Sequence, residues 1–406
     1  MMIVWICFFV YAVSYIGRLT YNTNVANIVK DMGILNKEAG KVASVHFFAY
    51  AIGQIVHGGF CQKYNSFFVM IVSLFASTFL TLIMFFINSI TAMMIIWGLN
   101  GFALSSLWSN CIKLIGEHVD DNKIDKAIVI MASTLPVGTI LAYVISALCT
   151  YLNVWKISFI ISTVLLFLVT LLLFMGIKIE KEFGKINNKE KKEDQPIQLK
   201  KNKSLWATFS FSFIFVAFLA FAVKFASEGI VLWMPQLLID NFSLSPAFSI
   251  LTTLLLPLLG LVQSIITGFI DRRFKNQLYT AALFMVIGLI TLIILLYTIK
   301  MFAALSIALC ALIYFVLGGV ITLLTSRMPL LWRKYTSSGK LTGILNCFCY
   351  IGAVVSSYSM GAAVDSFGWN MFFYILIGTC LLAGISALVG GVLLQKRTKK
   401  LEADNN

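Results

Sequence analysis

Apolar residues follow one another along this chain in long runs, and short polar stretches separate the runs. Most runs reach about 20 residues, the length that an α-helix needs to cross a hydrocarbon core about 30 Å thick. We count twelve of them, at residues 2–28, 40–60, 66–87, 90–115, 127–150, 154–177, 206–239, 246–270, 277–299, 301–326, 342–364 and 369–395. The pattern predicts an all-α polytopic membrane protein with twelve transmembrane helices.

One polar segment is much longer than the other connections. Residues 178–203 are rich in Lys, Glu and Asn and hold too few apolar side chains to build a core. We therefore expect two pseudo-symmetric six-helix halves on either side of it. Their predicted bounds are 1–177 for the first half, 178–205 for a cytoplasmic basic linker, 206–395 for the second half and 396–406 for a cytoplasmic tail.

The composition changes this picture only by narrowing the class of protein. The chain is 60% hydrophobic and 12% charged, with a mean hydropathy of +0.92, which excludes a water-soluble globular domain. The eight cysteines have neither CxxC nor zinc-like spacing. The motifs HExxH, GxSxG and GxxxxGKS or GxxxxGKT are absent from the sequence. We predict no enzyme, no cofactor and no metal site.

The positive charge of the chain is distributed in a way that predicts its orientation. If both termini are cytoplasmic, 24 of the 31 Lys and Arg residues lie on the cytoplasmic side, as the positive-inside rule requires. These residues are spread over loops without aromatic residues between them, which argues against a nucleic-acid partner. We expect a monomer in the cell membrane, surrounded by lipid, with both termini cytoplasmic.

The two predicted halves resemble each other, as the repeats of transporters commonly do. The segment FVYAVSYIGR at 9–18 aligns without a gap with FVAFLAFAVK at 215–224, so Arg18 corresponds to Lys224. The segment GFIDRR at 268–273 combines a glycine that permits close helix packing with an acid and two bases. We expect it to form a conformational hinge loop made of Gly268, Asp271, Arg272 and Arg273.

Five longer segments carry a resemblance to a known family. They are SYIGRLTYN from Ser14, AYAIGQIVHGG from Ala49, WGLNGFALSSLWSNCIKL from Trp97, EGIVLWMPQLL from Glu228 and GILNCFCYIGAVVSS from Gly343. They are similar to segments of the major facilitator superfamily and, within it, of the organophosphate:phosphate antiporters, which transport glycerol phosphate and hexose phosphates. The resemblance implies a pocket between the halves that opens alternately to either side, where two basic residues hold a phosphate.

The resemblance identifies the first of the two basic positions clearly, whereas the second has two candidates. Arg18 matches the family's arginine on the first helix. On the seventh helix the family pattern places Ser227 at the basic position, whereas the internal repeat places Lys224 there, and both assignments stay open. Two other family positions differ, because the second-helix lysine is Gln54 here and the fifth-helix histidine is Leu135.

Arg18 is the strongest candidate for ligand binding, because it lies inside an apolar run. An arginine at the centre of a membrane helix costs about 2.5 to 3.5 kcal/mol unless it meets water or a partner, so we expect Arg18 to face an interior cavity. Its planar donor fork suits bidentate binding of a carboxylate or a phosphate. The alternative is a structural ion pair with an acid inside the membrane.

Lys224 and Glu228 are four residues apart on one predicted helix, close enough to pair. Three interpretations stay open. In the first, the pair is inert, and Arg18 alone then favours a monoanion or a carboxylate as the substrate. Alternatively Lys224 contacts the substrate, or Glu228 takes up a proton during transport.

Further polar residues recur at helical spacing on the predicted second helix and elsewhere. His46, Tyr50 and Gln54 form a stripe expected to face the cavity. We interpret His46 as a satisfied interfacial residue, with proton coupling as the alternative. The remaining candidates for substrate contact are Tyr11, Tyr15, Tyr314, Asn346 and Tyr350.

Together these features predict a secondary active transporter of a small organic anion, for example a phosphorylated metabolite exchanged for inorganic phosphate. One alternative is a proton-coupled symporter of carboxylates or sugar acids that uses Glu228 or His46. Another is a hexose-phosphate sensor built on the same scaffold that does not transport.

Overall fold

The computed structural model describes residues 1–60, 65–119, 123, 126–127, 130–131, 133–187, 211–274, 276–331 and 338–403. Across these residues the chain is helical and forms no strand. The helices before the central polar segment are α1 (Met2–Thr23), α2 (Val25–Met32), α3 (Asn36–Phe60), α4 (Ser66–Phe86), α5 (Ile90–Leu104), α6 (Leu107–His118), α8 (Thr134–Tyr151) and α9 (Ile157–Asn187).

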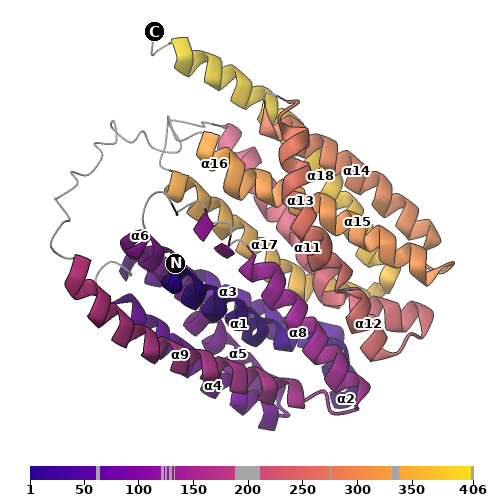
Figure 1. Cartoon of the computed structure of the whole chain (residues 1–406). Helices are drawn as coiled ribbons and strands as arrows, with labels where there is room; N and C mark the ends of the chain where they lie inside the picture. The colour runs from indigo at the N-terminus through magenta and orange to yellow at the C-terminus, as the bar shows by residue number, and fades with distance from the viewer. Residues whose placement is uncertain are drawn as a thin grey trace. The chain divides into compact units, whose positions relative to one another are not determined.

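The helices after that segment run to the end of the described chain. They are α11 (Ser212–Phe242), α12 (Pro246–Thr252), α13 (Leu255–Asp271), α14 (Gln277–Thr298), α15 (Ala303–Thr322), the π-helical turn η2 (Leu323–Arg327), α16 (Met328–Leu331), α17 (Ser338–Phe367) and α18 (Trp369–Ala403). Figure 1 shows both sets as elongated helices that lie alongside one another within each set.

Ten segments within the described residues are long and apolar enough to cross a membrane. A bent pair, Pro246–Gly260 with Ile265–Asp271 at 44°, gives an eleventh if it is one span. At the remaining predicted position, 40–60, the structure has α3, whose polar residues lower its apolar character. The all-α membrane fold expected from the sequence is confirmed.

Two predicted spans are interrupted where polar residues supply alternative hydrogen bonds. The span predicted at 90–115 divides into α5 and α6, and the first span ends its regular helix before Asn24. The Asn24 side-chain amide donates to the carbonyl of Thr20 at 2.8 Å and to the hydroxyl of Ser158 at 3.0 Å. Such side-chain bonds compete with the helical pattern and explain the break.

The described helices cluster into two compact units. The first contains Met1–Met32 and Val45–Leu199, and the second contains Gly33–Ser44 and Lys200–Asn406. In the first unit α1 packs against α8 and α9, while α4 packs against α5 and α9. In the second unit α11 packs against α15, α17 and α18. The predicted linker at 178–205 lies largely outside the described residues, so its bounds stay a prediction.

The start of α3 packs within the second unit because α17 offers it a complementary end. The Asp365 carboxylate accepts hydrogen bonds from the backbone N–H groups of Asn36 at 3.1 Å and Lys37 at 2.7 Å. Those are donors that a helix N-terminus leaves without an intrahelical partner. A Cβ on Gly40 would overlap the carbonyl of Ser357, so only glycine permits this close approach.

Candidate functional site

Arg18 lies on α1 and is buried, with 9% of its surface exposed. Its guanidinium carbon lies 4.1 Å from the ring centre of Tyr50, 5.5 Å from that of Tyr15 and 5.7 Å from that of Phe47. Aromatic rings attract a guanidinium at such distances through their quadrupoles. The first unit therefore holds the cation that the sequence singled out among rings from α1 and α3.

The polar stripe predicted on α3 is divided by the fold. Tyr50 contacts Arg18, whereas Gln54 lies one turn further along and is half-buried. His46 is 2% exposed, and its Nδ1 donates to the carbonyl of Trp97 at 3.0 Å. His46 is thus buried against α5 and has a hydrogen-bond partner there, while its depth in the membrane stays a prediction.

The two tyrosines predicted on the face of Arg18 lie together on α1. Their rings meet edge to face at 5.3 Å, and Tyr11 also contacts Trp108 of α6 at 4.7 Å. Tyr15 is half-buried beside Arg18, while Tyr11 is buried. The fold therefore brings Tyr15 to the Arg18 cation, and Tyr11 contacts Tyr15.

In the second unit Lys224 and Glu228 of α11 form an ion pair, with Nζ and Oε2 2.8 Å apart. Their side chains are 27% and 6% exposed. Tyr314 of α15 and Tyr350 of α17 lie within electrostatic range of the Lys224 ammonium group. The pair expected from the i, i+4 spacing exists, and two predicted tyrosines lie near it.

The two other candidates of the second unit differ in burial. Ser227 of α11 is 3% exposed, whereas Asn346 of α17 is half-buried. Which of Lys224 and Ser227 occupies the basic position of the family therefore stays a prediction. What it adds is that Lys224 already has a carboxylate at hydrogen-bonding distance.

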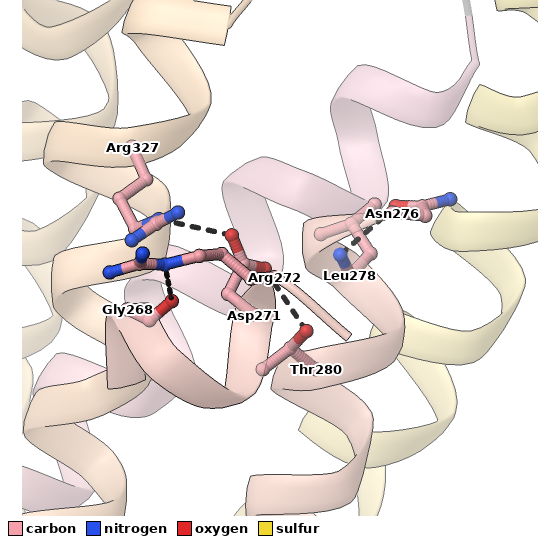
Figure 2. A network of polar contacts seen from close by, with 7 residues as sticks. All are labelled: Gly268, Asp271, Arg272, Asn276, Leu278, Thr280 and Arg327. Atoms are coloured by element: carbon pink, nitrogen blue, oxygen red, sulfur yellow. Dashed lines mark hydrogen bonds and ion pairs between the residues drawn. The ribbon is translucent and has the colours of Figure 1, made fainter. Parts of the chain in front are cut away.

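The acid of the predicted hinge loop has partners on two other elements. Asp271 at the end of α13 is 3% exposed and pairs with Arg327 of η2, Nε to Oδ2, at 3.0 Å. Thr280 of α14 donates to the other carboxylate oxygen at 3.0 Å. Figure 2 shows Asp271 between these two side chains. One carboxylate therefore joins α13, α14 and η2.

The two bases that follow Asp271 take no part in that contact. Arg272 donates from Nε to the carbonyl of Gly268 in its own helix at 3.3 Å (Figure 2), and Arg273 lies over the ring of Phe269. Gly268 is close to Arg327, because a Cβ built on it would approach Nη1 to 2.6 Å. The predicted loop thus contains one buried acid and two exposed bases.

Sequence reasoning missed three residues of these sites. Phe47 and Trp97 resembled ordinary apolar positions, and Arg327 was counted only as a cytoplasmic base. The one available signal was Arg327's place directly after an apolar run, at the predicted cytoplasmic surface where the Asp271 loop is also expected. Among the described residues, no cluster of three or more His, Cys, Asp or Glu side chains has metal-ligand geometry.

Apolar helices long enough to cross a bilayer, with a buried cation on α1, define a polytopic integral membrane protein. The chain belongs to the Major Facilitator Superfamily, whose family model matches residues 7–334. The resemblance expected from the sequence segments is thereby confirmed. The members it resembles are membrane transporters, and the chain is a transporter of this superfamily, not an enzyme.

Two curated relatives match nearly the whole chain. The "Glycerol-3-phosphate transporter" of Bacillus subtilis (strain 168) is 24% identical over 395 residues, covering 91% of this chain and 88% of the relative. A "Probable hexose phosphate transport protein" of Chlamydia trachomatis serovar D is 19% identical over 415 residues, covering 94% and 89%.

Solved structures share the fold at low sequence identity. A bacterial homologue of the human lysosomal transporter Spinster, in an inward-facing and unoccupied conformation, aligns with a TM-score of 0.75 at 12% identity, covering 99% of this chain and 98% of that one. The nucleoside transporter NupG aligns with a TM-score of 0.69 at 12% identity, covering 97% and 99%.

Proposed function

We propose that the protein carries a small organic anion across the cell membrane, and that this anion is a phosphorylated metabolite of the glycerol phosphate or hexose phosphate class. Arg18 binds the anion. The observation that carries this proposal is the buried guanidinium of Arg18, held against aromatic rings inside a membrane-spanning helix. The similarity to a glycerol-3-phosphate transporter and to a probable hexose phosphate transport protein supports the substrate class.

The chemistry of the guanidinium favours an oxyanion as its ligand. A charge inside a membrane helix is costly, and a bound anion lowers that cost by neutralising it. A guanidinium presents parallel N–H donors that match two oxygens of one phosphate or carboxylate. We propose that further polar side chains contribute to substrate recognition. In the first unit these are Tyr11, Tyr15, Tyr50 and Gln54, and in the second unit they are Lys224 or Ser227, with Tyr314, Asn346 and Tyr350.

We propose alternating access with exchange for inorganic phosphate as the transport cycle. A ligand drives such a cycle only through different affinities for the conformations involved. A carrier whose cation needs an anion changes conformation slowly when empty, which couples export of one anion to import of another. Asp271, whose carboxylate joins α13, α14 and η2, is proposed as the switch that responds to these changes.

Reconstituted protein tests the proposal directly. Proteoliposomes loaded with inorganic phosphate should take up labelled glycerol 3-phosphate, and unloaded ones should not. Arg18→Lys keeps the charge but loses the donor fork, so Vmax/KM should fall by about 100-fold, the loss of about two charge-assisted hydrogen bonds. Arg397→Lys, on α18 beyond the predicted last span, is the matched control and should transport like the wild type.

Three outcomes would contradict parts of the proposal. Uptake by Arg18→Lys equal to the wild type would remove the bidentate role of Arg18. Uptake that needs no internal phosphate and collapses with a protonophore would replace exchange by proton symport. Specific binding of a hexose phosphate without any uptake would favour a sensor.

A further inference from the structure

A stack of flat groups extends from Arg18 through rings of two other helices. The Tyr50 ring, which lies 4.1 Å from the Arg18 guanidinium carbon, is stacked on the imidazole of His46 with centroids 6.4 Å apart and planes at 23°. His46 is stacked in turn on Trp97 of α5, at 5.3 Å and 29°. Aromatic rings at these separations attract each other beyond their buried area. The stack therefore joins α1, α3 and α5.

The far end of this stack returns to the helix that carries Arg18. Tyr21, three residues after Arg18 on α1, contacts the Trp97 ring at 5.8 Å. Tyr21 and Trp97 are fully buried, and Tyr50 is 2% exposed. Because both ends are held by α1, no ring in the series can tilt without disturbing its neighbour in a close-packed interior.

The backbone of α5 is shaped to receive His46. A Cβ on Gly101 would overlap the His46 carbonyl and approach Nδ1 to 3.0 Å, and a Cβ on Gly98 would approach the Val45 side chain to 2.8 Å. Two glycines therefore permit α3 and α5 to come close enough for Nδ1 to reach the Trp97 carbonyl. A side chain at either glycine position would push the two helices apart.

The hydrogen bond of His46 also defines its tautomer. A backbone carbonyl can only accept, so Nδ1 carries a proton, and in the neutral form of the ring Nε2 bears the lone pair. Nε2 is buried and, among the described residues, makes no hydrogen bond. The imidazole is thus oriented by its ring contacts and by the hydrogen bond of Nδ1.

We propose that His46 is a positioning residue for anion binding. It holds the Tyr50 ring in place, and Tyr50 holds the plane of the Arg18 guanidinium, so the donor fork faces its ligand in one orientation. This inference rests on the proposed function, because it concerns how Arg18 binds an oxyanion. It also limits the ligand: a guanidinium held in one orientation binds through a fixed pair of N–H groups, which favours anions that present two oxygens side by side.

Variants at position 46 separate ring stacking from proton chemistry. His46→Phe keeps a flat ring without an ionisable nitrogen, His46→Leu removes the ring, and His46→Asn keeps a donor for the Trp97 carbonyl without the ring. His57→Phe changes a second histidine of α3, whose ring contacts Phe102 instead of this stack, and serves as the matched control. The measurements are KM and Vmax for glycerol 3-phosphate, and the thermal shift of purified protein on adding glycerol 3-phosphate or inorganic phosphate.

The expected result is a split between affinity and rate. His46→Leu and His46→Asn should raise KM by about 3- to 10-fold, the range that an aromatic contact contributes, with Vmax within about twofold of the wild type. The thermal shift produced by phosphate should fall in parallel. His46→Phe should restore KM, and its uptake should keep the wild-type pH profile between about pH 6 and pH 8, where a free histidine titrates.

Other results would overturn the inference. Wild-type KM in His46→Leu would show that the ring does not position Arg18. Loss of uptake or a changed pH profile in His46→Phe would show that the imidazole acts through its proton. If His46→Leu and His46→Asn do not fold, His46→Phe alone decides. A folded His46→Phe protein with an altered KM contradicts the inference, and one with the wild-type KM supports it. Wild-type protein that neither binds nor transports either anion would defeat the proposed function itself, a result distinct from all of these.

Discussion

At the scale of single residues, the Lys224–Glu228 ion pair determines how much positive charge α11 can offer an anion. With Nζ and Oε2 2.8 Å apart and Glu228 only 6% exposed, each charge is compensated by the other. Removing one partner leaves a charge in a costly environment, whereas removing both does not. We therefore expect Lys224→Met to lower uptake strongly and the double variant Lys224→Met with Glu228→Gln to recover it to within about threefold of the wild type. Uptake into phosphate-loaded proteoliposomes measures this.

The double variant also decides between the interpretations of this pair. If it stays as inactive as Lys224→Met, Lys224 contacts the substrate directly. If it transports but has lost sensitivity to a protonophore that the wild type shows, Glu228 carries the coupling proton. Ser227→Ala on the same helix tests the remaining assignment, since loss of uptake there would place the seventh-helix contact at Ser227.

At the scale of elements, the buried Asp271 carboxylate joins the end of α13 to α14 and η2. Asp271→Asn keeps the hydrogen bond from Thr280 but removes the charge opposite Arg327, whose side chain is 30% exposed. We expect thermal unfolding in detergent to show a loss of about 1 to 3 kcal/mol, the cost of leaving a partly buried charge without its partner. The exposed neighbour Arg273→Gln is the control and should change stability by less than about 0.5 kcal/mol.

A result in which Arg273→Gln destabilises as much as Asp271→Asn would contradict this account of the loop. It would mean that the exposed bases contribute as much to stability as the buried acid does. We expect the larger effect at Asp271 because its buried carboxylate has two partners, Arg327 and Thr280. Such a group contributes more to stability than exposed bases that are screened by water.

At the scale of the whole molecule, the distribution of Lys and Arg predicts that both termini are cytoplasmic. A fluorescent protein fused after Asn406 should therefore fluoresce in a bacterial host, and alkaline phosphatase fused at the same place should be inactive. Fusions within the segment 33–35, which joins α2 to α3, should behave in the opposite way. Phosphatase activity at the C-terminus would show that the orientation is the opposite of the predicted one. The Asp271 loop would then lie on the other side of the membrane.

Much of the fold could be predicted because its cause is local in sequence. Long apolar runs in lipid have to form helices, since no water is there to satisfy the backbone. The pairing of Lys224 with Glu228 follows equally from the period of the helix. The places where prediction differed, at Asn24 and between α5 and α6, are those where side chains or breaks compete with that local rule.

The candidate sites could be predicted only in part. Arg18 was evident because a cation in an apolar run is costly wherever the helix lies. Its environment was not, since nothing in their spacing distinguishes Phe47 or Trp97 from lipid-facing or core residues. The partner of Asp271 was hidden for the same reason, because Arg327 lies far along the chain and meets it only through helix packing.

The sequence by itself determined the class of protein, the approximate helices and the cation on α1, because transfer into lipid depends on composition and on helical period. Tertiary structure alone decided which rings cover Arg18, that His46 is buried against Trp97 of α5, and that residues 33–44 pack with the second unit. Those outcomes depend on shape at close range, on glycines that let helices approach and on side chains that complete each other's hydrogen bonds. Contacts of that kind are made between residues distant in the chain and have no local period.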